Sequence, residues 1–172
     1  MSLPPFKSAT RRRVPPRPFA PSEKWRRSQK PPQPMILFDY PGLRGQGISM
    51  RDLALGQGRV PMENPQEAVL ARSGVRTIVF RIIWPGYESS EFEWARSISV
   101  VNESGAHIPR QALAIQIAAS IESWVEKAQY WRPSDASWAV MPRYIEFKNM
   151  FLVALVNTFD DVWQADVALD VA

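Results

Sequence analysis

The sequence predicts an α+β fold in which an antiparallel sheet packs against one long helix, with short helices near its N-terminal end. Three observations lead to this class. Residues 75–101 contain two segments with apolar side chains at every second position, residues 109–130 carry an apolar stripe at helical spacing, and residues 163–171 alternate again between apolar and polar. The order of hairpin, helix and further strands is typical of a β-grasp. Strands and helices do not alternate regularly, which disfavours a parallel doubly wound sheet.

Residues 1–34 differ in composition from the rest of the chain. They contain nine of the 16 prolines, nine of the 21 basic side chains and one of the 17 acidic side chains. Their net charge is therefore +8, whereas residues 35–172 carry −4. Because each proline fixes φ and removes a donor, and few large apolar residues accompany them, burial cannot offset the entropy of ordering. We expect a disordered, basic, proline-rich arm over residues 1–34 and a single α+β domain over residues 35–172.

Two clusters of cationic side chains in the arm are candidate contacts for nucleic acid or another partner. Such clusters bind phosphates or act as nuclear import signals. Arg12, Pro15 and Pro18 also match the PxxP ligand of an SH3-type groove. A mitochondrial presequence is disfavoured because the prolines prevent an amphipathic helix, and a solvated tail without a dedicated partner is the remaining alternative. The candidate contact residues are Arg11, Arg12, Arg13, Arg17, Trp25, Arg26 and Arg27.

The domain is expected to begin with an opening strand and two short helices. Residues 35–40 form a short apolar run that ends at a Pro-Gly turn. Ser49 is a candidate cap for a helix over residues 49–55. Asn64 and the proline after it form a better start signal, for a helix that Gly74 ends.

A hairpin and the long helix follow. Residues 75–84 have apolar side chains on both faces, so this strand is expected at the centre of the sheet. Residues 92–101 alternate with period two and are its predicted antiparallel partner. Pro109 suits the first position of a helix that reaches Tyr130.

The last third of the chain is expected to add strands. Residues 144–147 are a short candidate, and residues 163–171 alternate as a half-buried strand. Residues 150–156 are continuously apolar, a pattern that fits a buried strand or a buried helix. We favour a strand there.

No catalytic, metal or cofactor site is predicted. Residues 42–49 match a phosphate-binding loop except that Ile48 replaces the lysine that neutralises the phosphates, so a plain glycine-rich loop is favoured. His107 is the sole histidine and lies just before the long helix, where capping or exposure is usual. The absence of cysteine excludes disulfides, thiolate zinc sites and cysteine nucleophiles.

Acidic and aromatic residues outside the arm favour structural roles. Carboxylates cluster near residues 88–93 and 160–170, where solubility explains them better than metal binding or glycoside hydrolysis does. The arginines of residues 75–84 alternate with core residues, which favours packing over stacking on nucleic-acid bases. Trp131 and Trp138 lie in a polar stretch and are candidates for an interaction surface, with folding over the sheet as the alternative.

The sequence also bears on location. It contains no run of the ~20 apolar residues that a membrane helix needs. It begins without the apolar region of a secretory signal. We expect no membrane contact and an intracellular protein, cytoplasmic or nuclear, and the lack of cysteine fits a reducing compartment.

Four segments, residues 38–42, 80–87, 107–113 and 162–167, resemble a group of short uncharacterised proteins from mushroom-forming fungi. The resemblance covers residues 36–170 and leaves the arm out. It implies a fungal source and an intracellular protein. It implies no activity, and no site residue follows from it.

These observations favour a non-enzymatic binding or scaffold module with a basic arm. Such a module fits a chain without a recognisable catalytic set and with a protein partner at the arm or at a tryptophan surface. One alternative is a nucleic-acid-associated protein that binds a polyanion through residues 1–34. The other is an enzyme of unrecognised class, which requires a pocket with convergent polar groups.

Overall fold

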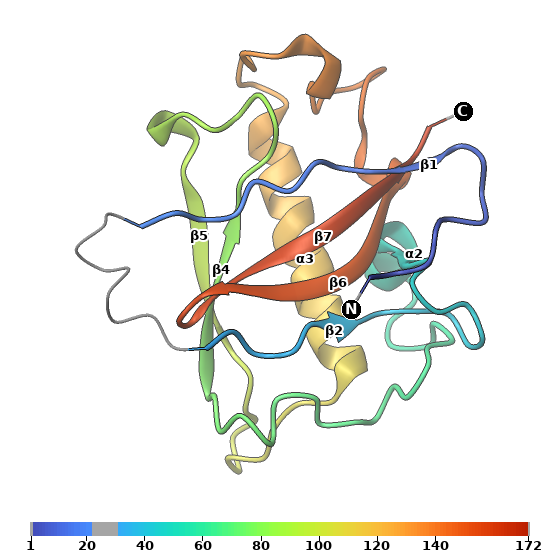
Figure 1. Cartoon of the computed structure of the whole chain (residues 1–172), viewed down its shortest axis with the longest axis vertical. Helices are drawn as coiled ribbons and strands as arrows, with labels where there is room; N and C mark the ends of the chain where they lie inside the picture. The colour runs from blue at the N-terminus through green and yellow to red at the C-terminus, as the bar shows by residue number, and fades with distance from the viewer. Residues whose placement is uncertain (1, 22–30, 172) are drawn as a thin grey trace.

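The computed structural model describes residues 2–21 and 31–171 and shows a seven-stranded sheet with one main helix against it (Figure 1). The mixed α+β class is therefore confirmed. The elements are β1 (Arg11–Arg13), β2 (Ile36–Leu37), β3 (Ile48–Ser49), α2 (Met50–Leu55), β4 (Thr77–Ile82), β5 (Trp94–Ser99), α3 (Arg110–Ala128), β6 (Met150–Phe159) and β7 (Val162–Asp170), with short 3-10 turns at Ser90–Phe92, Ala136–Trp138 and Phe147–Asn149.

The strands of the sheet follow the order β2-β6-β7-β4-β5, with β3 also paired to β6 and β1 also paired to β7. The prediction of an antiparallel sheet is wrong at its centre, where β4 and β7 run parallel. The other paired strands run antiparallel. The predicted hairpin is present as β4 and β5, which pair from Thr77 with Ser99 to Ile82 with Trp94. β4 lies between β5 and β7, as its two apolar faces predicted.

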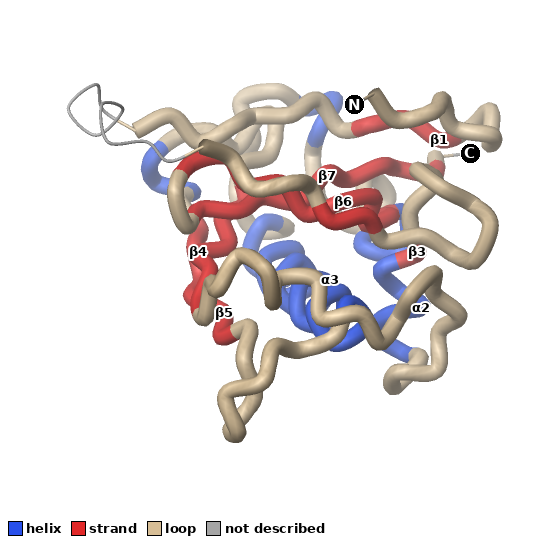
Figure 2. Tube along the Cα trace, turned by 60° about the horizontal axis from the view of Figure 1, so that its bottom comes forward, coloured by secondary structure: helices blue, strands red, loops and turns tan. Residues whose placement is uncertain are grey.

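The long helix α3 packs its apolar stripe against one face of the sheet. Leu113, Ile121 and Trp124 are at most 2 % exposed, and the Trp124 ring centroid lies 5.4 Å from that of Trp84. Figure 2 shows α3 below the layer of β6 and β7 and the N-terminal segment above it. The stripe was predicted correctly, although Pro109 takes the N-cap position instead of the first helical position.

The continuous apolar run in the last third is a strand, as we favoured. It forms β6, in which Leu152, Val153, Ala154 and Leu155 are all fully buried. Both faces of β6 need apolar side chains because α3 covers one and the N-terminal segment covers the other (Figure 2). The alternating segment after it forms β7 and pairs with β6 along most of its length.

The opening strand and the first short helix form within the predicted ranges. β2 is the two-residue part of residues 35–40 that pairs with β6. α2 is capped by Ser49, whose hydroxyl accepts from the backbone N–H of Asp52 at 3.3 Å. A local cap is sufficient here because the helix also buries Leu53, which is 1 % exposed.

Two predicted elements are replaced by turns. Residues 64–74 contain no helix, because the carbonyl of Glu67 accepts from the N–H of Arg110 at 2.8 Å instead of from its own segment. This contact caps α3, which has no side-chain cap. The unpaired N–H groups at the start of α3 therefore bind the carbonyls that a helix over residues 64–74 would use itself. Residues 144–147 contribute an isolated bridge through Ile145 and no strand.

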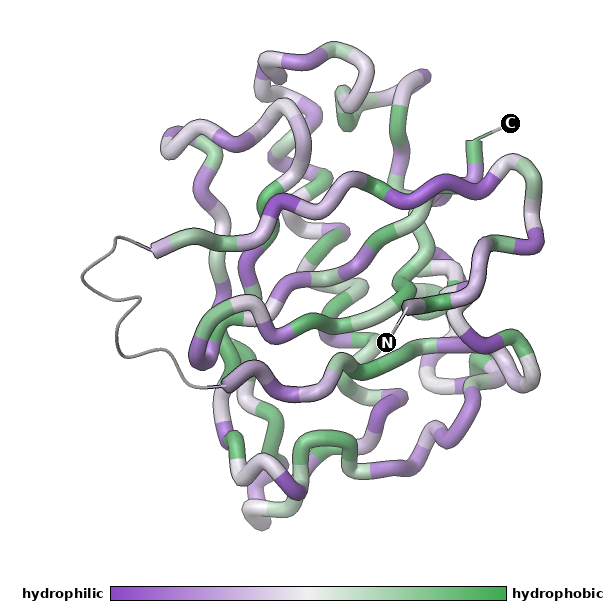
Figure 3. Tube along the Cα trace, in the orientation of Figure 1, coloured by the Kyte–Doolittle hydropathy of each residue, from purple (hydrophilic) through white to green (hydrophobic). Residues whose placement is uncertain are grey.

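The prediction of a disordered arm is wrong for residues 2–21. β1 pairs antiparallel with the end of β7, from Arg11 opposite Asp170 to Arg13 opposite Ala168, and Val14 is 7 % exposed in the core. Figure 3 shows the run of hydrophilic residues at β1. Composition predicted disorder because it counts apolar residues, whereas the pairing here uses backbone groups and opposite charges. Residues 22–30 of the expected arm lie outside the described residues.

Two leucines on helices provide a test of the core. Leu113→Ala should lower the free energy of unfolding by about 2–5 kcal/mol, because a fully buried side chain leaves a cavity in a packed interior. Leu55→Ala is the matched control, since Leu55 is 68 % exposed and its loss should change stability by less than about 0.5 kcal/mol. Urea unfolding measures both. Equal losses in the two variants would contradict the placement of α3.

Candidate functional site

The pairing between β4 and β7 stops after two pairs. Val79 lies opposite Val162 and Phe80 opposite Trp163. Continued at the same register, the ladder would pair residues 81–84 with residues 164–167. A cavity of about 320 Å³ occupies this place instead, and all eight of these residues line it. Consecutive side chains of a strand point to opposite faces of the sheet. A cavity on one face would therefore contact every second residue, whereas an opening between two strand edges contacts four consecutive residues on each strand. The cavity is therefore a gap within the sheet.

Prolines in the N-terminal segment explain why the gap stays open. β1 continues as far as Val14, whose N–H donates to the carbonyl of Val167 at 2.9 Å. Pro15, Pro16 and Pro18 follow, and they have no N–H with which to extend a ladder along β7. The segment therefore leaves the sheet and passes over the gap, and residues 13–18 form one wall of the cavity. Figure 1 shows this segment leaving the end of β7 and passing in front of α3.

The side chain of Gln164 holds residues 17–19, the roof of the cavity, in place by two hydrogen bonds. The Gln164 side-chain amide donates to the carbonyl of Arg17 at 3.0 Å and accepts from the N–H of Phe19 at 2.7 Å. Gln164 is 8 % exposed, so both bonds are shielded from water. They hold residues 17–19 over the point where β4 and β7 separate.

The remaining walls are mostly apolar. Ile121 and Trp124 come from α3, and Val156 comes from β6. Trp84 lies two residues after the end of β4 and is 3 % exposed. An apolar lining with a small number of polar groups is typical of pockets that hold small molecules.

The polar groups of the lining fall into two kinds. Asp166 accepts from Arg13 at 3.1 Å, and burial raises the pKa of this carboxyl while the Arg13 guanidinium opposes the shift. In contrast, Thr158 Oγ1 and Arg81 Nε are buried and have no hydrogen-bond partner among the described residues. Arg81 uses another nitrogen, Nη1, to bind Glu93 at 2.5 Å. Both residues line the cavity, but these two atoms are closed off from it and from solvent.

The arginines predicted to contact a partner are occupied within the chain where the structure describes them. Arg11 binds Asp170 at 3.1 Å, Arg13 binds Asp166, and Arg17 binds Glu88 at 3.3 Å. These carboxylates come from the two acidic clusters that the sequence assigned to solubility. Two of the arginines also stack on rings, Arg11 at 3.6 Å from the centroid of Phe151 and Arg12 at 5.0 Å from that of Trp138. Trp25, Arg26 and Arg27 lie outside the described residues.

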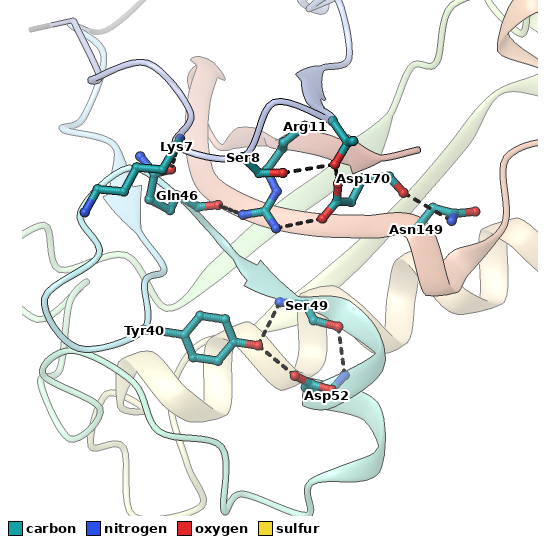
Figure 4. A network of polar contacts seen from close by, with 10 residues as sticks. Lys7, Ser8, Arg11, Tyr40, Gln46, Ser49, Asp52, Asn149 and Asp170 are labelled. Carbon is teal, nitrogen blue, oxygen red and sulfur yellow. Dashed lines mark hydrogen bonds and ion pairs between the residues drawn. The ribbon is translucent and has the colours of Figure 1, made fainter. Parts of the chain in front are cut away.

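A polar network ties the start of the chain to the glycine-rich loop, as Figure 4 shows. Arg11 donates to the carbonyl of Gln46 at 2.9 Å as well as to Asp170. The Gln46 side chain accepts from the N–H of Lys7 at 2.8 Å. The hydrogen bond from Thr10 is the main cause that lowers the pKa of Asp170, and Arg11 adds to it.

The glycine-rich loop is a structural element, as favoured over a phosphate site. The carboxylate of Asp39 accepts from the N–H groups of Gly45 and Gly47 at 3.0 and 3.1 Å. These are the groups that a phosphate-binding loop needs to leave open for its ligand. A side chain on Gly45 would also lie 2.8 Å from Pro4, so this glycine lets the N-terminal segment approach closely.

A second cavity of about 340 Å³ lies beside this loop, lined in part by Asp39, Tyr40, Glu63 and Arg110. Arg110 Nε is buried without a partner among the described residues, but other polar groups of the lining are used within the chain. Glu63 accepts from the N–H of Gly42 at 3.2 Å, and Tyr40 donates to Asp52 at 2.7 Å. Burial, with that hydrogen bond, raises the pKa of Tyr40 to about 12. This cavity is therefore a weaker candidate than the gap in the sheet.

The two tryptophans proposed as an interaction surface fold onto the protein. Trp131 is half-buried, and its ring centroid lies 5.2 Å from that of Phe92 and 6.5 Å from that of Tyr87. The carbonyl of Trp138 accepts from the indole of Trp84 at 3.1 Å. Folding over the sheet, the alternative to an exposed surface, describes both. His107 is likewise structural, with Nε2 2.8 Å from the carbonyl of Val75.

Sequence reasoning missed Arg81, Thr158 and Gln164, the residues that give the cavity its polar features. They lie within strands that pair elsewhere, so nothing local marks them. One signal was present. The prolines that follow Val14 forbid continued pairing, but this has meaning only once β1 is known to lie against β7.

The described residues hold no group of three or more histidine, aspartate or glutamate side chains that could bind a metal. In the same part of the chain, no helix has the length and apolar character to cross a membrane. No protein-family model, curated protein or solved structure matches this sequence. The fungal resemblance therefore stays a prediction.

The unused hydroxyl of Thr158 leads to a stability prediction. Thr158→Val keeps the shape of the side chain and removes a buried polar group without a partner, so the free energy of unfolding should be unchanged or rise by up to about 1 kcal/mol. Thr10→Val is the matched control. It should lower stability, because the Thr10 hydroxyl donates to Asp170. Urea unfolding compares the two, and a clear loss from Thr158→Val would show that its hydroxyl is already satisfied.

The pKa shift of Asp170 leads to a pH prediction. Because its folded pKa is lowered, this carboxylate stabilises the fold above its unfolded pKa of about 3.9, and the contribution disappears as pH falls through the folded pKa. Asp170→Asn should therefore lower stability at about pH 7 by less than about 1 kcal/mol, and by less than that below about pH 3.9, where the contribution is being lost. Asp161→Asn, at an exposed residue of the β6–β7 turn, is the control. A loss from Asp170→Asn that does not vary with pH would contradict the assigned role.

Proposed function

We propose that this protein is a non-enzymatic binding module that holds a small, mainly apolar molecule in the cavity between β4 and β7. The observation that supports it is the interrupted ladder. Residues 81–84 and 164–167 stand where pairing would continue, yet they enclose about 320 Å³ instead. This volume lies near the lower end of the range for small-molecule pockets, about 300–1,000 Å³.

The energetics of packing also favour an occupied cavity. A gap lined by Trp84, Ile121 and Trp124 forfeits the dispersion contacts that a filled interior would make. An apolar molecule that restores those contacts leaves water for a preformed site. Because residues 17–19, which cover the cavity, are held by hydrogen bonds from Gln164, little ordering is needed when the molecule binds.

The alternatives in the sequence receive less support. A polyanion that binds Arg11, Arg13 or Arg17 would have to displace the carboxylates that already pair with them. An enzyme would need a base with freedom to act, whereas Asp166 is engaged by Arg13 and His107 does not line the cavity. The first argument favours a neutral or weakly charged ligand, and the second favours binding over catalysis.

We also propose that β4, β5, α3, β6 and β7 form a β-grasp-like unit. The support is that their chain order is hairpin, helix, hairpin and their order in the sheet is β5-β4-β7-β6. The two central strands, β4 and β7, are the parallel pair. In this interpretation the cavity is the place where the central pair of the unit separates, and β1 to β3 are additions around it.

Titration with 1-octanol tests the proposed function. Isothermal titration calorimetry should show saturable 1:1 binding with a negative heat-capacity change, because apolar surface is buried. Ala165→Leu and Ile83→Phe each add a side chain that fills the cavity, and each should weaken binding at least tenfold while the fold is kept. Ala71→Leu is the control, since Ala71 is exposed. Absence of saturation, or binding that both filling variants leave intact, would overturn the proposal.

A further inference from the structure

Strand β5 is the outermost strand of the sheet beside β4 (Figure 1). Just beyond the end of this ladder, the N–H of Val100 donates to the carbonyl of Arg76 at 2.9 Å, so these two residues form a hydrogen-bonded pair. Hydrogen-bonded pairs alternate with non-bonded pairs along an antiparallel ladder. The residues of β5 that bond to β4 are therefore Ile98, Arg96 and Trp94.

The backbone groups of Ala95, Ser97 and Ser99 consequently point away from β4. On the other edge of β4, the N–H of Val79 donates to the carbonyl of Asp161 at 2.8 Å. This agrees with the alternation, because Val79 lies opposite Ser97. No backbone group of these three β5 residues is hydrogen-bonded to a described residue, and all three residues are exposed. A row of backbone donors and acceptors is thus open to another strand.

The other edges of the sheet are covered or very short. β1 pairs with the end of β7, and the outer edge of β6 carries β2 and β3, each of two residues. Edge strands are often protected by lysine, proline or a bulge. β5 contains neither residue, and its ladder with β4 has no shift of register. Its one charged residue is Arg96.

Arg96 determines the charge of this edge. Its side chain lies on the same face as Trp94 and Ile98, with the guanidinium carbon 5.0 Å from the centroid of the Trp94 ring. Trp94 and Ile98 are buried, whereas Arg96 is exposed and makes no ion pair with a described residue. A strand added to β5 would place one side chain directly opposite Arg96. A carboxylate stabilises that position and a second cation destabilises it.

The N-terminal segment shows the same mode of recognition within this chain. β1 adds to the edge of β7 through backbone pairing, and its alternate side chains Arg11 and Arg13 pair with Asp170 and Asp166. There a basic segment binds a strand that carries carboxylates. β5 carries a guanidinium instead, so the complementary segment is acidic.

A second copy of this chain fits the edge less well. Two β5 strands could pair about a twofold axis at Ser97 or at Arg96. The two copies of Arg96 would then lie diagonal to each other in the first case and directly opposite in the second. Like charges across a strand pair are destabilising, and a charge within an edge strand is one way in which proteins avoid edge-to-edge association.

We propose that the open edge of β5 binds an extended acidic segment of a partner protein, which adds a strand to the sheet. Hydrogen bonds to the backbone of Ala95, Ser97 and Ser99 supply the affinity, and a carboxylate opposite Arg96 supplies the selectivity. No residue of β5 lines the cavity between β4 and β7. The two sites are therefore separate, and this inference does not rest on the proposed function.

Two synthetic peptides with blocked ends test the inference, TVTETVT and TVTKTVT. Each is symmetrical about its central residue, so it presents the same side chains to β5 in either strand direction. Each is titrated at about pH 7 into the full chain labelled with ¹⁵N. The glutamate peptide should shift the amide signals of Ala95, Ser97 and Ser99 saturably, and it should bind about fivefold more tightly than the lysine peptide.

Matched variants separate the charge from the backbone edge. Arg96→Glu should reverse the preference between the peptides, while Arg51→Glu makes the same charge change at an exposed position on α2 and should leave it intact. Ser97→Pro removes the N–H that faces the open edge and should abolish binding of both peptides, because proline is tolerated at an edge but cannot donate. Ser97→Ala keeps this N–H and should bind normally.

The possible outcomes are distinct. If Ser97→Pro fails to fold, the reversed preference of Arg96→Glu still decides. Absence of saturable shifts at β5, or equal binding of the two peptides, overturns the inference. Shifts at β5 that depend on protein concentration without peptide would identify a second copy as the occupant and would also overturn it. The proposed function is tested separately by the binding of 1-octanol.

Discussion

The pairing of β1 with the edge of β7 is the interaction on which the rest of the structure depends. β4 pairs with the first residues of β7, and β1 pairs with the last residues of β7 along the same edge. Arg11 with Asp170 and Val14 with Val167 fix the register of the N-terminal segment. Without this docking, the outer face of β6 and β7 would lose its cover and the cavity would lose one wall. The positive charge of the segment therefore serves to bind the acidic side of its own domain.

A missing backbone donor then shapes the cavity. Where Val14 ends the ladder, Pro15 and Pro16 cannot continue it, so the chain that would fill the gap becomes its roof. Pro15 and Pro18, which suggested a PxxP ligand for a separate groove, are used within the molecule. Covering the edge of β7 also removes a surface on which another strand could pair.

Much of the domain could be predicted from the sequence because its signals are local. The period-two pattern of β4 and β5, the stripe of α3 and the Ser49 cap each describe an environment that their own segment creates. The prediction of a helix after Asn64 was wrong because carbonyls of this segment accept hydrogen bonds from the first N–H groups of α3. That interaction involves a distant part of the chain, so the local pattern does not show it. The ion pair between Arg11 and Asp170 was not predicted for the same reason, because its two residues lie at opposite ends of the chain. The place of Arg81 and Thr158 in the cavity lining could not be predicted, since it depends on where two strands separate.

The separation of the docked partners along the chain affects how the protein is made. Arg11 and Asp170 are 159 positions apart, so ribosomal synthesis completes the cationic segment long before its acceptor strand exists. Throughout translation this segment is exposed to polyanions and chaperones, and closure of so long a loop follows collapse of the central sheet. We expect the nascent chain to pass through a folding intermediate. In it the central sheet has formed, the N-terminal segment is not yet paired with β7, and the cavity lacks the wall that residues 13–18 provide.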